Sequence, residues 1–217
     1  MKARVYVEGR ADSAALEALL RPLIHEARQK RNGIQFFPLG GKDSLLELAG
    51  RKGANDLLEH PDDWVFALPD LYPMAPYRGT PWEHRSCAEL RKLLERRFTE
   101  HANRVGVSQQ CRNHFQVFCL KHDLEVLLLA APESLRERLP TPDALRGRWR
   151  NPPEDQDDDK PPKRIVEALF RQYAKRDYIG TTDAPWILGR ATLADVVRAC
   201  PQQFAPFVEE LRRVAAS

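Results

Sequence analysis

The chain has 217 residues, of which 42% are hydrophobic and 30% are charged. This composition is typical of a folded globular protein and excludes a disordered or fibrous chain. Lys and Arg total 34 against 31 Asp and Glu, and the resulting formal net charge of +3 is too balanced to indicate nucleic-acid binding by bulk charge. No apolar run reaches the length of a membrane span, no signal peptide is visible, and the four cysteines lack metal-ligand or disulfide spacing. We therefore expect a cytoplasmic protein with reduced thiols and no membrane segment.

Strand-like and helix-like segments alternate along residues 1–140. Short apolar or alternating runs predict strands at 4–7, 33–39, 64–68 and 115–120. Leucines at helical spacing predict helices at 12–24, 43–58 and 82–103, and a further helix is expected after residue 121. This order predicts an α/β fold with a mainly parallel sheet flanked by helices.

The chain changes character after Pro140. Residues 151–162 contain four prolines, five acidic residues and no apolar side chains, which predicts a mobile, solvated loop within a linker of residues 141–162. Helical periods at 165–173, 192–199 and 204–214 then predict a helical extension over residues 163–217. We expect this extension to pack on the 1–140 core.

Carboxylates follow three of the four predicted strands. Glu8 follows the first strand, Asp70 the third, and Asp123 and Glu125 the fourth. The carboxyl ends of parallel strands form the edge of the sheet where ligands bind. Carboxylates gathered there repel one another unless a cation neutralises them, and Mg²⁺ prefers such oxygen ligands. For any single residue the alternative is an ordinary polar loop position, but the set favours a metal site.

The residues Val5-Tyr6-Val7-Glu8-Gly9, followed later by Asp70, resemble the Toprim fold of topoisomerases, primases and nucleases of the OLD type. In that superfamily, a Glu after the first strand serves as general acid or base, and an Asp-x-Asp pair holds magnesium. The present sequence departs at the pair, because Tyr72 stands where the second Asp is expected. A phenol is a poor magnesium ligand at neutral pH, which puts the usual two-metal arrangement in doubt.

An ordered set of motifs resembles a narrower group, the Toprim-like family catalogued as domain of unknown function 4276. The set spans nearly the whole chain and consists of Tyr6-Val7-Glu8-Gly9, Asp70-x-Tyr72, the segment 122–128 (HDLEVLL), Pro162-Lys163-Arg164-Ile165, Tyr173-x-Lys175 and Cys200-Pro201-x-x-Phe204. Asp123 and Leu124 depart from the Glu and Phe that are typical of the second segment. The resemblance implies a neighbouring gene for an AAA or SMC-like ATPase and a role in defence against phages or plasmids.

The candidate site residues fall into two groups. The proposed catalytic and metal-binding group consists of Glu8, Asp70 and Glu125, with His122 placed beside Glu125 on the first turn of a helix to ligate, relay a proton or hold phosphate. The proposed phosphate-binding group consists of Lys163, Arg164, Lys175 and Tyr72. Alternatives stay open, since His122 and Asp123 also suit the start of a helix, Tyr72 could fill its loop, and the basic residues could form a solvated helix face.

Other polar features carry less weight. Gly40-Gly41-Lys42-Asp43-Ser44 lacks the spacing of a phosphate-binding loop and is interpreted as a turn into a helix. His84, His101 and His114 are expected at the surface. The arginines of residues 136–150 (Arg136, Arg138, Arg146, Arg148 and Arg150), beside Trp149, could form a surface for nucleic acid or a partner.

Together these features predict a nuclease that hydrolyses phosphodiester bonds of DNA or RNA with Mg²⁺ or Mn²⁺ as cofactor. It would work with a separately encoded AAA or SMC-like ATPase. The alternative is a catalytically inactive adaptor or sensor that keeps the fold and binds an ATPase or nucleic acid. Both DNA and RNA remain candidate substrates, and both a monomer and a homodimer remain candidate oligomeric states.

Overall fold

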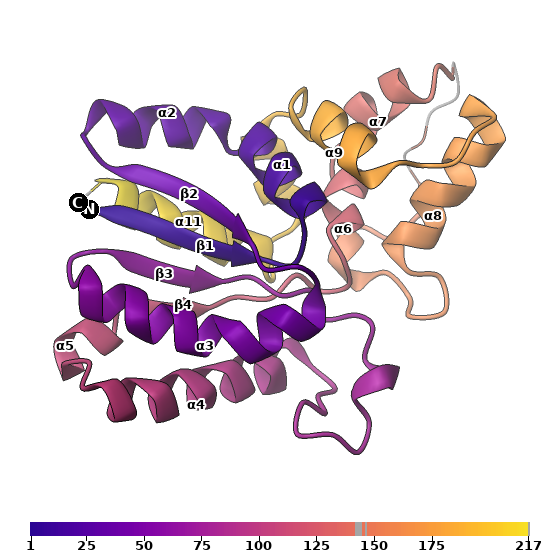
Figure 1. Cartoon of the computed structure of the whole chain (residues 1–217). Helices are drawn as coiled ribbons and strands as arrows, with labels where there is room; N and C mark the ends of the chain where they lie inside the picture. The colour runs from indigo at the N-terminus through magenta and orange to yellow at the C-terminus, as the bar shows by residue number, and fades with distance from the viewer. Residues whose placement is uncertain (142–144, 146, 217) are drawn as a thin grey trace.

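The computed structural model describes residues 1–141, 145 and 147–216 and contains a four-stranded parallel sheet in the order β2-β1-β3-β4 (Figure 1). The strands are β1 (Lys2–Val7), β2 (Gly33–Pro38), β3 (Trp64–Ala67) and β4 (Phe115–Val117). Ala3 of β1 pairs with Ile34 on one side and Trp64 on the other. The predicted α/β class with a parallel sheet is therefore confirmed, and the four strands occur where the sequence placed them.

Helices cover both faces of the sheet. The first face carries α1 (Arg10–Leu19), α2 (Arg21–Gln29) and α11 (Phe204–Ala216), and the second carries α3 (Lys42–Glu59) and α4 (Cys87–Val105) (Figure 1). Alternate residues of β1 supply the two cores, because successive side chains of a strand point to opposite faces. Val5 and Val7 belong to the core under the first set of helices, and Tyr6 belongs to the core under the second.

Several helices gather beyond the carboxyl ends of the strands (Figure 1). They are α6 (Glu125–Leu129), α7 (Pro132–Arg138), α8 (Pro162–Leu169) and α9 (Gly180–Leu188), while the short helices α5 (Gln109–Arg112) and α10 (Leu193–Ala199) lie in connections. Helix α9 was not predicted, because Gly180 and Pro185 interrupt its helical pattern. It packs closely against α1 and is followed by Gly189, where a Cβ would lie only 2.9 Å from the carbonyl oxygen of Pro185. None of the helices in the described part of the chain is long and apolar enough to span a membrane.

The acidic segment 151–162 differs from the expected solvated loop. Pro153, Glu154 and Gln156 are buried, and Glu154 is only 1% exposed. The Glu154 carboxylate accepts hydrogen bonds from three backbone N–H groups at the start of α11, at 2.7 Å from Gln202, 2.8 Å from Gln203 and 3.2 Å from Phe204. A helix start leaves such donors unpaired, so this carboxylate supplies their partners and fixes the segment to the end of the chain.

Two arginines of residues 136–150, Arg138 and Arg150, are held in ion pairs with aspartates. Arg138 and Arg176 both bind the fully buried Asp183, with nitrogen–oxygen distances of 2.7 and 2.6 Å. Arg150 binds Asp157 at 2.6 Å. Arg146 lies outside the described residues. The ion pair of Arg138 joins α7 to α9, and that of Arg150 stays within the segment 150–157, so neither arginine is free of an acidic partner, which weakens the hypothesis of a nucleic-acid surface there.

The expected surface position of His84 is wrong, because this residue is buried and only 2% exposed. Helix α4 begins at Cys87 rather than near residue 82, since Ser86 caps it by accepting a hydrogen bond from the Glu89 N–H. His84 therefore lies in the preceding loop and points into the protein, with Nδ1 2.6 Å from the carbonyl oxygen of Trp82.

We predict that Glu154→Gln lowers the free energy of unfolding by about 2–3 kcal/mol, because it removes a buried charge that accepts three backbone hydrogen bonds. Urea denaturation measures this change. The exposed Asp159 of the same segment provides the matched control, and Asp159→Asn should change the free energy by less than about 0.5 kcal/mol. Equal effects of the two substitutions would show that Glu154 does not anchor the segment.

Candidate metal and phosphate site

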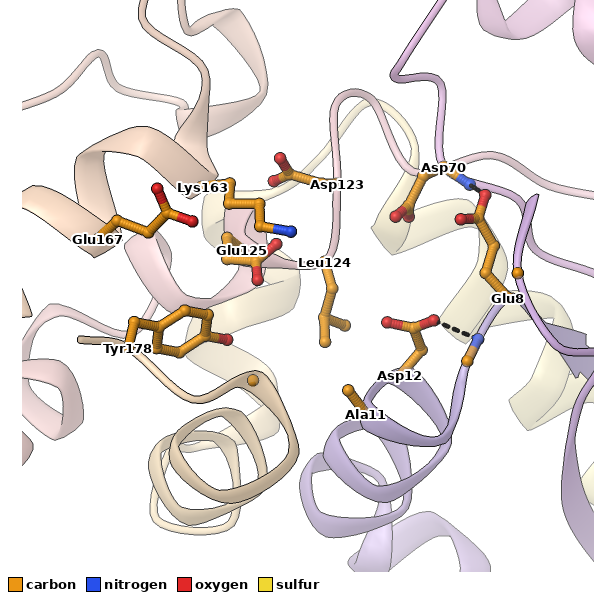
Figure 2. A pocket seen from close by; sticks show the side chains of 13 residues that line it. Glu8, Ala11, Asp12, Asp70, Asp123, Leu124, Glu125, Lys163, Glu167 and Tyr178 are labelled. Atoms are coloured by element: carbon orange, nitrogen blue, oxygen red, sulfur yellow. Dashed lines mark hydrogen bonds between the residues drawn. The ribbon is translucent and has the colours of Figure 1, made fainter. Parts of the chain in front are cut away.

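A pocket of about 500 Å³ opens at the carboxyl ends of the strands, between the sheet and helices α8 and α9 (Figure 2). Six carboxylates and one ammonium group are among the side chains that line it: Glu8, Asp12, Asp70, Asp123, Glu125, Glu167 and Lys163. Three of the four predicted catalytic or metal-binding residues therefore reach one pocket. The parallel sheet brings them together, because β1, β3 and β4 all end at the same edge.

One side of the pocket, here named the sheet wall, consists of Glu8, Asp12 and Asp70 (Figure 2). Glu8 follows β1 directly, and its Oε1 accepts a hydrogen bond from the Asp70 N–H at 3.0 Å. Asp12 lies in the first turn of α1 and accepts from the Gly9 N–H at 2.7 Å. A carboxylate in this position stabilises the start of a helix. Backbone donors thus hold two of the three carboxylates of this wall.

The opposite side, here named the helix wall, consists of Asp123, Glu125, Lys163, Glu167 and Tyr178 (Figure 2). Asp123 lies in the loop after β4 and Glu125 begins α6, whereas Lys163 and Glu167 belong to α8 and Tyr178 lies in the connection before α9. The Oδ1 atom of Asp123 is buried and has no hydrogen-bond partner among the described residues. Buried carboxylate oxygens normally have a partner, so this atom retains the capacity to bind a further group such as a cation.

Burial and mutual repulsion disfavour the charged forms of these carboxylates. Burial raises the pKa of Glu8 from its ordinary value of 4.5 to about 7, although the hydrogen bond from Asp70 acts in the opposite direction. Burial, followed by the charge of Glu125, raises the pKa of Asp123 to about 8. Burial, followed by the charges of Glu8 and Asp12, holds the pKa of Asp70 well above its usual range. A divalent cation in the pocket would relieve this repulsion.

Among the described residues, no group of three or more Asp, Glu, His or Cys side chains is close enough to hold a metal ion by itself. The oxygen donors of the two walls are nevertheless of the kind that magnesium binds. Mg²⁺ keeps several waters and commonly binds one or two carboxylates together with phosphate oxygens of a substrate. Each wall offers at least two carboxylates, so the donor set suits an ion that shares its coordination with water and a bound phosphate.

His122 does not line the pocket, and its expected place on a helix with Glu125 is wrong. Helix α6 begins only at Glu125, and His122 precedes it with φ of +99°. Its ring is 1% exposed and stacks on Tyr72, with the ring centroids 5.3 Å apart. Burial lowers the pKa of His122. The strained loop turns the imidazole away from the carboxylates.

The predicted phosphate-binding residues are divided by the structure. Lys163 lines the pocket, but Arg164, Lys175 and Tyr72 are not among its lining residues. Arg164 and Lys175 are exposed, and Tyr72 lies half-buried against His122. Phosphate contacts of these three residues stay a prediction. Such contacts require a substrate long enough to extend beyond the pocket.

Sequence reasoning undervalued Asp123, Glu167 and Tyr178, which line the helix wall. Asp123 and Glu125 are two residues apart, an acidic pair of the kind that the Asp70-x-Tyr72 segment has lost. The spacing of Asp123 and Glu125 was the feature of the sequence that could have identified Asp123 as a site residue. Glu167 follows Lys163 by four residues and therefore shares its face of α8. Tyr178 carried no signal, because its approach to the pocket depends on the packing of the C-terminal helices.

The sheet and the strand-end pocket define an α/β protein of the Toprim-like class. The C-terminal region of the Burkholderia pseudomallei OLD protein has a similar fold, with a TM-score of 0.50 and 16% identity over 98% of both chains. The C-terminal region of the Xanthomonas campestris pv. campestris OLD protein aligns with a TM-score of 0.45 and 17% identity, over 99% of this chain and 95% of the other. No curated protein matches the chain.

The model of the family described as domain of unknown function (DUF4276) matches residues 7–212. This chain therefore belongs to that family, and both the resemblance drawn from the motifs and the Toprim-like fold are confirmed.

We predict that stability falls as pH rises through the neutral range, because of Glu8. Below its ordinary pKa of 4.5, Glu8 is protonated in both the folded and the unfolded chain and contributes nothing. Between that value and the folded value of about 7, the unfolded chain releases its proton while the folded chain keeps it, so rising pH favours the unfolded chain. The penalty reaches up to about 3 kcal/mol above the folded pKa.

Urea unfolding at about pH 5 and about pH 8 measures this difference. Glu8→Gln removes the ionisable group and should reduce the loss of stability between the two conditions. The control is Glu17→Gln on the exposed side of α1, which should keep the wild-type difference. The prediction is wrong if the Glu8 and Glu17 variants show the same pH dependence.

Proposed function

We propose that this protein is a Toprim-type nuclease that uses Mg²⁺ or Mn²⁺ to hydrolyse phosphodiester bonds of DNA or RNA. The observation that supports this function is the pocket at the carboxyl ends of β1, β3 and β4. It joins carboxylates of both walls with Lys163, the one cationic side chain among the described residues that line it. Such a site repels a phosphate unless a divalent cation neutralises the carboxylates.

Glu8 and Asp70 of the sheet wall, with Glu125 and Asp123 of the helix wall, are the residues that would hold the cation. A bound divalent cation neutralises negative charge on a phosphate and lowers the pKa of a bound water. The unpaired Oδ1 of Asp123 and the raised carboxylate pKa values support this assignment from the residues alone.

Two further roles follow from the remaining properties of the site. Glu8 lies at the end of β1 beside Asp70, and a carboxylate at this place can accept a proton from an attacking water. Lys163 projects toward the centre of the pocket (Figure 2), where its ammonium group can bind a non-bridging phosphate oxygen. Arg164 and Lys175 would then contact the backbone of a longer nucleic acid.

The proposed partner is a separately encoded AAA or SMC-like ATPase, and the proposed setting is defence against phages or plasmids in the cytoplasm. Both rest on the family resemblance. A homodimer is compatible with this proposal but is not required by it, since residues of one chain line the pocket from both sides.

One observation favours the alternative of a catalytically inactive adaptor. Tyr72 occupies the position of the second Asp in the usual Toprim pair and stacks on His122 outside the pocket. An adaptor would keep the nucleic-acid or ATPase surface and show no metal-dependent cleavage. The experiment below separates the two functions.

We predict that the purified protein cleaves DNA or RNA with Mg²⁺ or Mn²⁺, and that Glu8→Gln and Asp70→Asn each lower the rate at least about a hundredfold. These changes keep the side-chain shapes but remove the charges that would bind the cation and accept the proton. Lys163→Met should lower the rate by about tenfold or more through weaker phosphate binding. Gel-based cleavage of labelled single- and double-stranded DNA and RNA measures the rates.

The exposed Glu17 and Lys160 provide controls of matching charge. Glu17→Gln and Lys160→Met should retain cleavage within about threefold of the wild type. Cleavage that survives in the Glu8 and Asp70 variants would contradict the assigned site. A wild-type protein that binds nucleic acid but never cleaves it, with or without the ATPase, would favour the adaptor.

A further inference from the structure

The segment Gly40-Gly41-Lys42 connects β2 to α3 and passes beside the sheet wall. The N–H groups of Gly40 and Gly41 both donate to the backbone carbonyl of Glu8, at 3.0 and 2.7 Å. The two glycines have φ of +93° and +114°, conformations that other residues adopt only under strain. The glycine pair therefore allows the backbone conformation in which both N–H groups bind the Glu8 carbonyl oxygen.

Lys42 holds the segment that follows Asp70. Its side chain is buried, at 7% exposure, and its Nζ donates to the carbonyl oxygens of Leu71 and Pro73 at 2.7 and 3.1 Å. The same Nζ lies 3.4 Å from Nε2 of His84 and 5.2 Å from the centre of the Tyr77 ring. The buried ammonium group thus has two carbonyl oxygens, one imidazole nitrogen and one aromatic ring around it.

These contacts exclude a role for Lys42 in holding a substrate phosphate. Lys42 is not among the lining residues of the pocket, and its donors are already used by two carbonyls and an imidazole. A lysine is rarely buried unless specific partners compensate its charge. The carbonyl oxygens of Leu71 and Pro73 supply that compensation, and Glu8 and Asp70 are near enough to act on its pKa.

We propose that Gly40-Gly41-Lys42 is a clamp that positions Glu8 and Asp70 relative to each other, with Lys42 as its positioning residue. The glycines fix the backbone of Glu8, Lys42 fixes the carbonyls of Leu71 and Pro73, and the Asp70 N–H donates to Glu8 Oε1. The three contacts close a ring between the ends of β1, β2 and β3. The consequence for cation binding rests on the proposed function, whereas the clamp itself rests on the contacts.

Lys42→Met tests the clamp, since it keeps the length of the side chain but removes the charge and all donors. Amide hydrogen exchange in the metal-free protein should become faster in residues 69–74, because the carbonyls of Leu71 and Pro73 lose their partner. The affinity for Mn²⁺, measured by electron paramagnetic resonance, should fall by about tenfold or more. Loss of a nearby positive charge alone would act in the opposite direction and tighten Mn²⁺ binding.

Two controls separate the clamp from general effects. Lys52→Met makes the same change on the exposed side of the same helix and should leave both measurements unchanged. Gly40→Ala tests the other half of the clamp without requiring Lys42 to be replaced, and it should also weaken Mn²⁺ binding. Its control is Gly79→Ala, where φ is +71° and nothing lies within 4 Å of the added methyl group, so the backbone strain is similar but Glu8 is not contacted.

Faster exchange with weaker Mn²⁺ binding in the Lys42 and Gly40 variants, but not in their controls, supports the clamp. Unchanged exchange in the Lys42 variant overturns it. Faster exchange with equal or tighter Mn²⁺ binding overturns the positioning role. A wild-type protein that binds no Mn²⁺ overturns the proposed function and the positioning role together. If the wild type binds Mn²⁺ and the Lys42→Met variant binds it equally well, only the positioning role is overturned.

Discussion

The burial of several carboxylates at one edge of the sheet is the constraint on which the site depends. Glu8, Asp70 and Asp123 follow strands that end side by side, so the parallel topology forces their charges together. Backbone N–H groups offset part of the repulsion at Glu8 and Asp12. Lys163 supplies one positive charge against six carboxylates in the pocket lining. The remaining negative charge explains why the folded site favours either bound protons or a cation.

The sequence predicted the sheet well, because strand identity depends on short apolar runs bounded by Gly, Pro and Asp. It also predicted the meeting of Glu8, Asp70 and Glu125, because their positions after parallel strands determine it. It failed for Glu154 and His84, whose burial depends on contacts with Gln202 and Lys42, far away in the chain. It failed at His122 because a positive φ ended the expected helical continuity. Local patterns contain none of these contacts.

The pocket has walls from two parts of the chain, and this arrangement links the helical extension to the chemistry. The sheet wall comes from the 1–140 core, whereas Lys163, Glu167 and Tyr178 come from the extension. The close packing of α1 on α9 holds the two parts together. Ala11, next to Asp12, lies against Gly180 at the start of α9. A shift of α9 would therefore change the width of the pocket.

The tyrosine in Asp70-x-Tyr72 gains a structural explanation from these contacts. Tyr72 and His122 stack on each other outside the pocket and join the loop after β3 to the loop after β4. The Tyr72 N–H also donates to the His122 carbonyl at 3.1 Å. A second aspartate at position 72 would lose the ring contact and place another charge beside a buried imidazole. Asp123 and Glu125, which the joined loops bring to the opposite wall, supply carboxylates that the tyrosine cannot. The pocket therefore has acidic side chains after both β3 and β4, although position 72 carries a tyrosine.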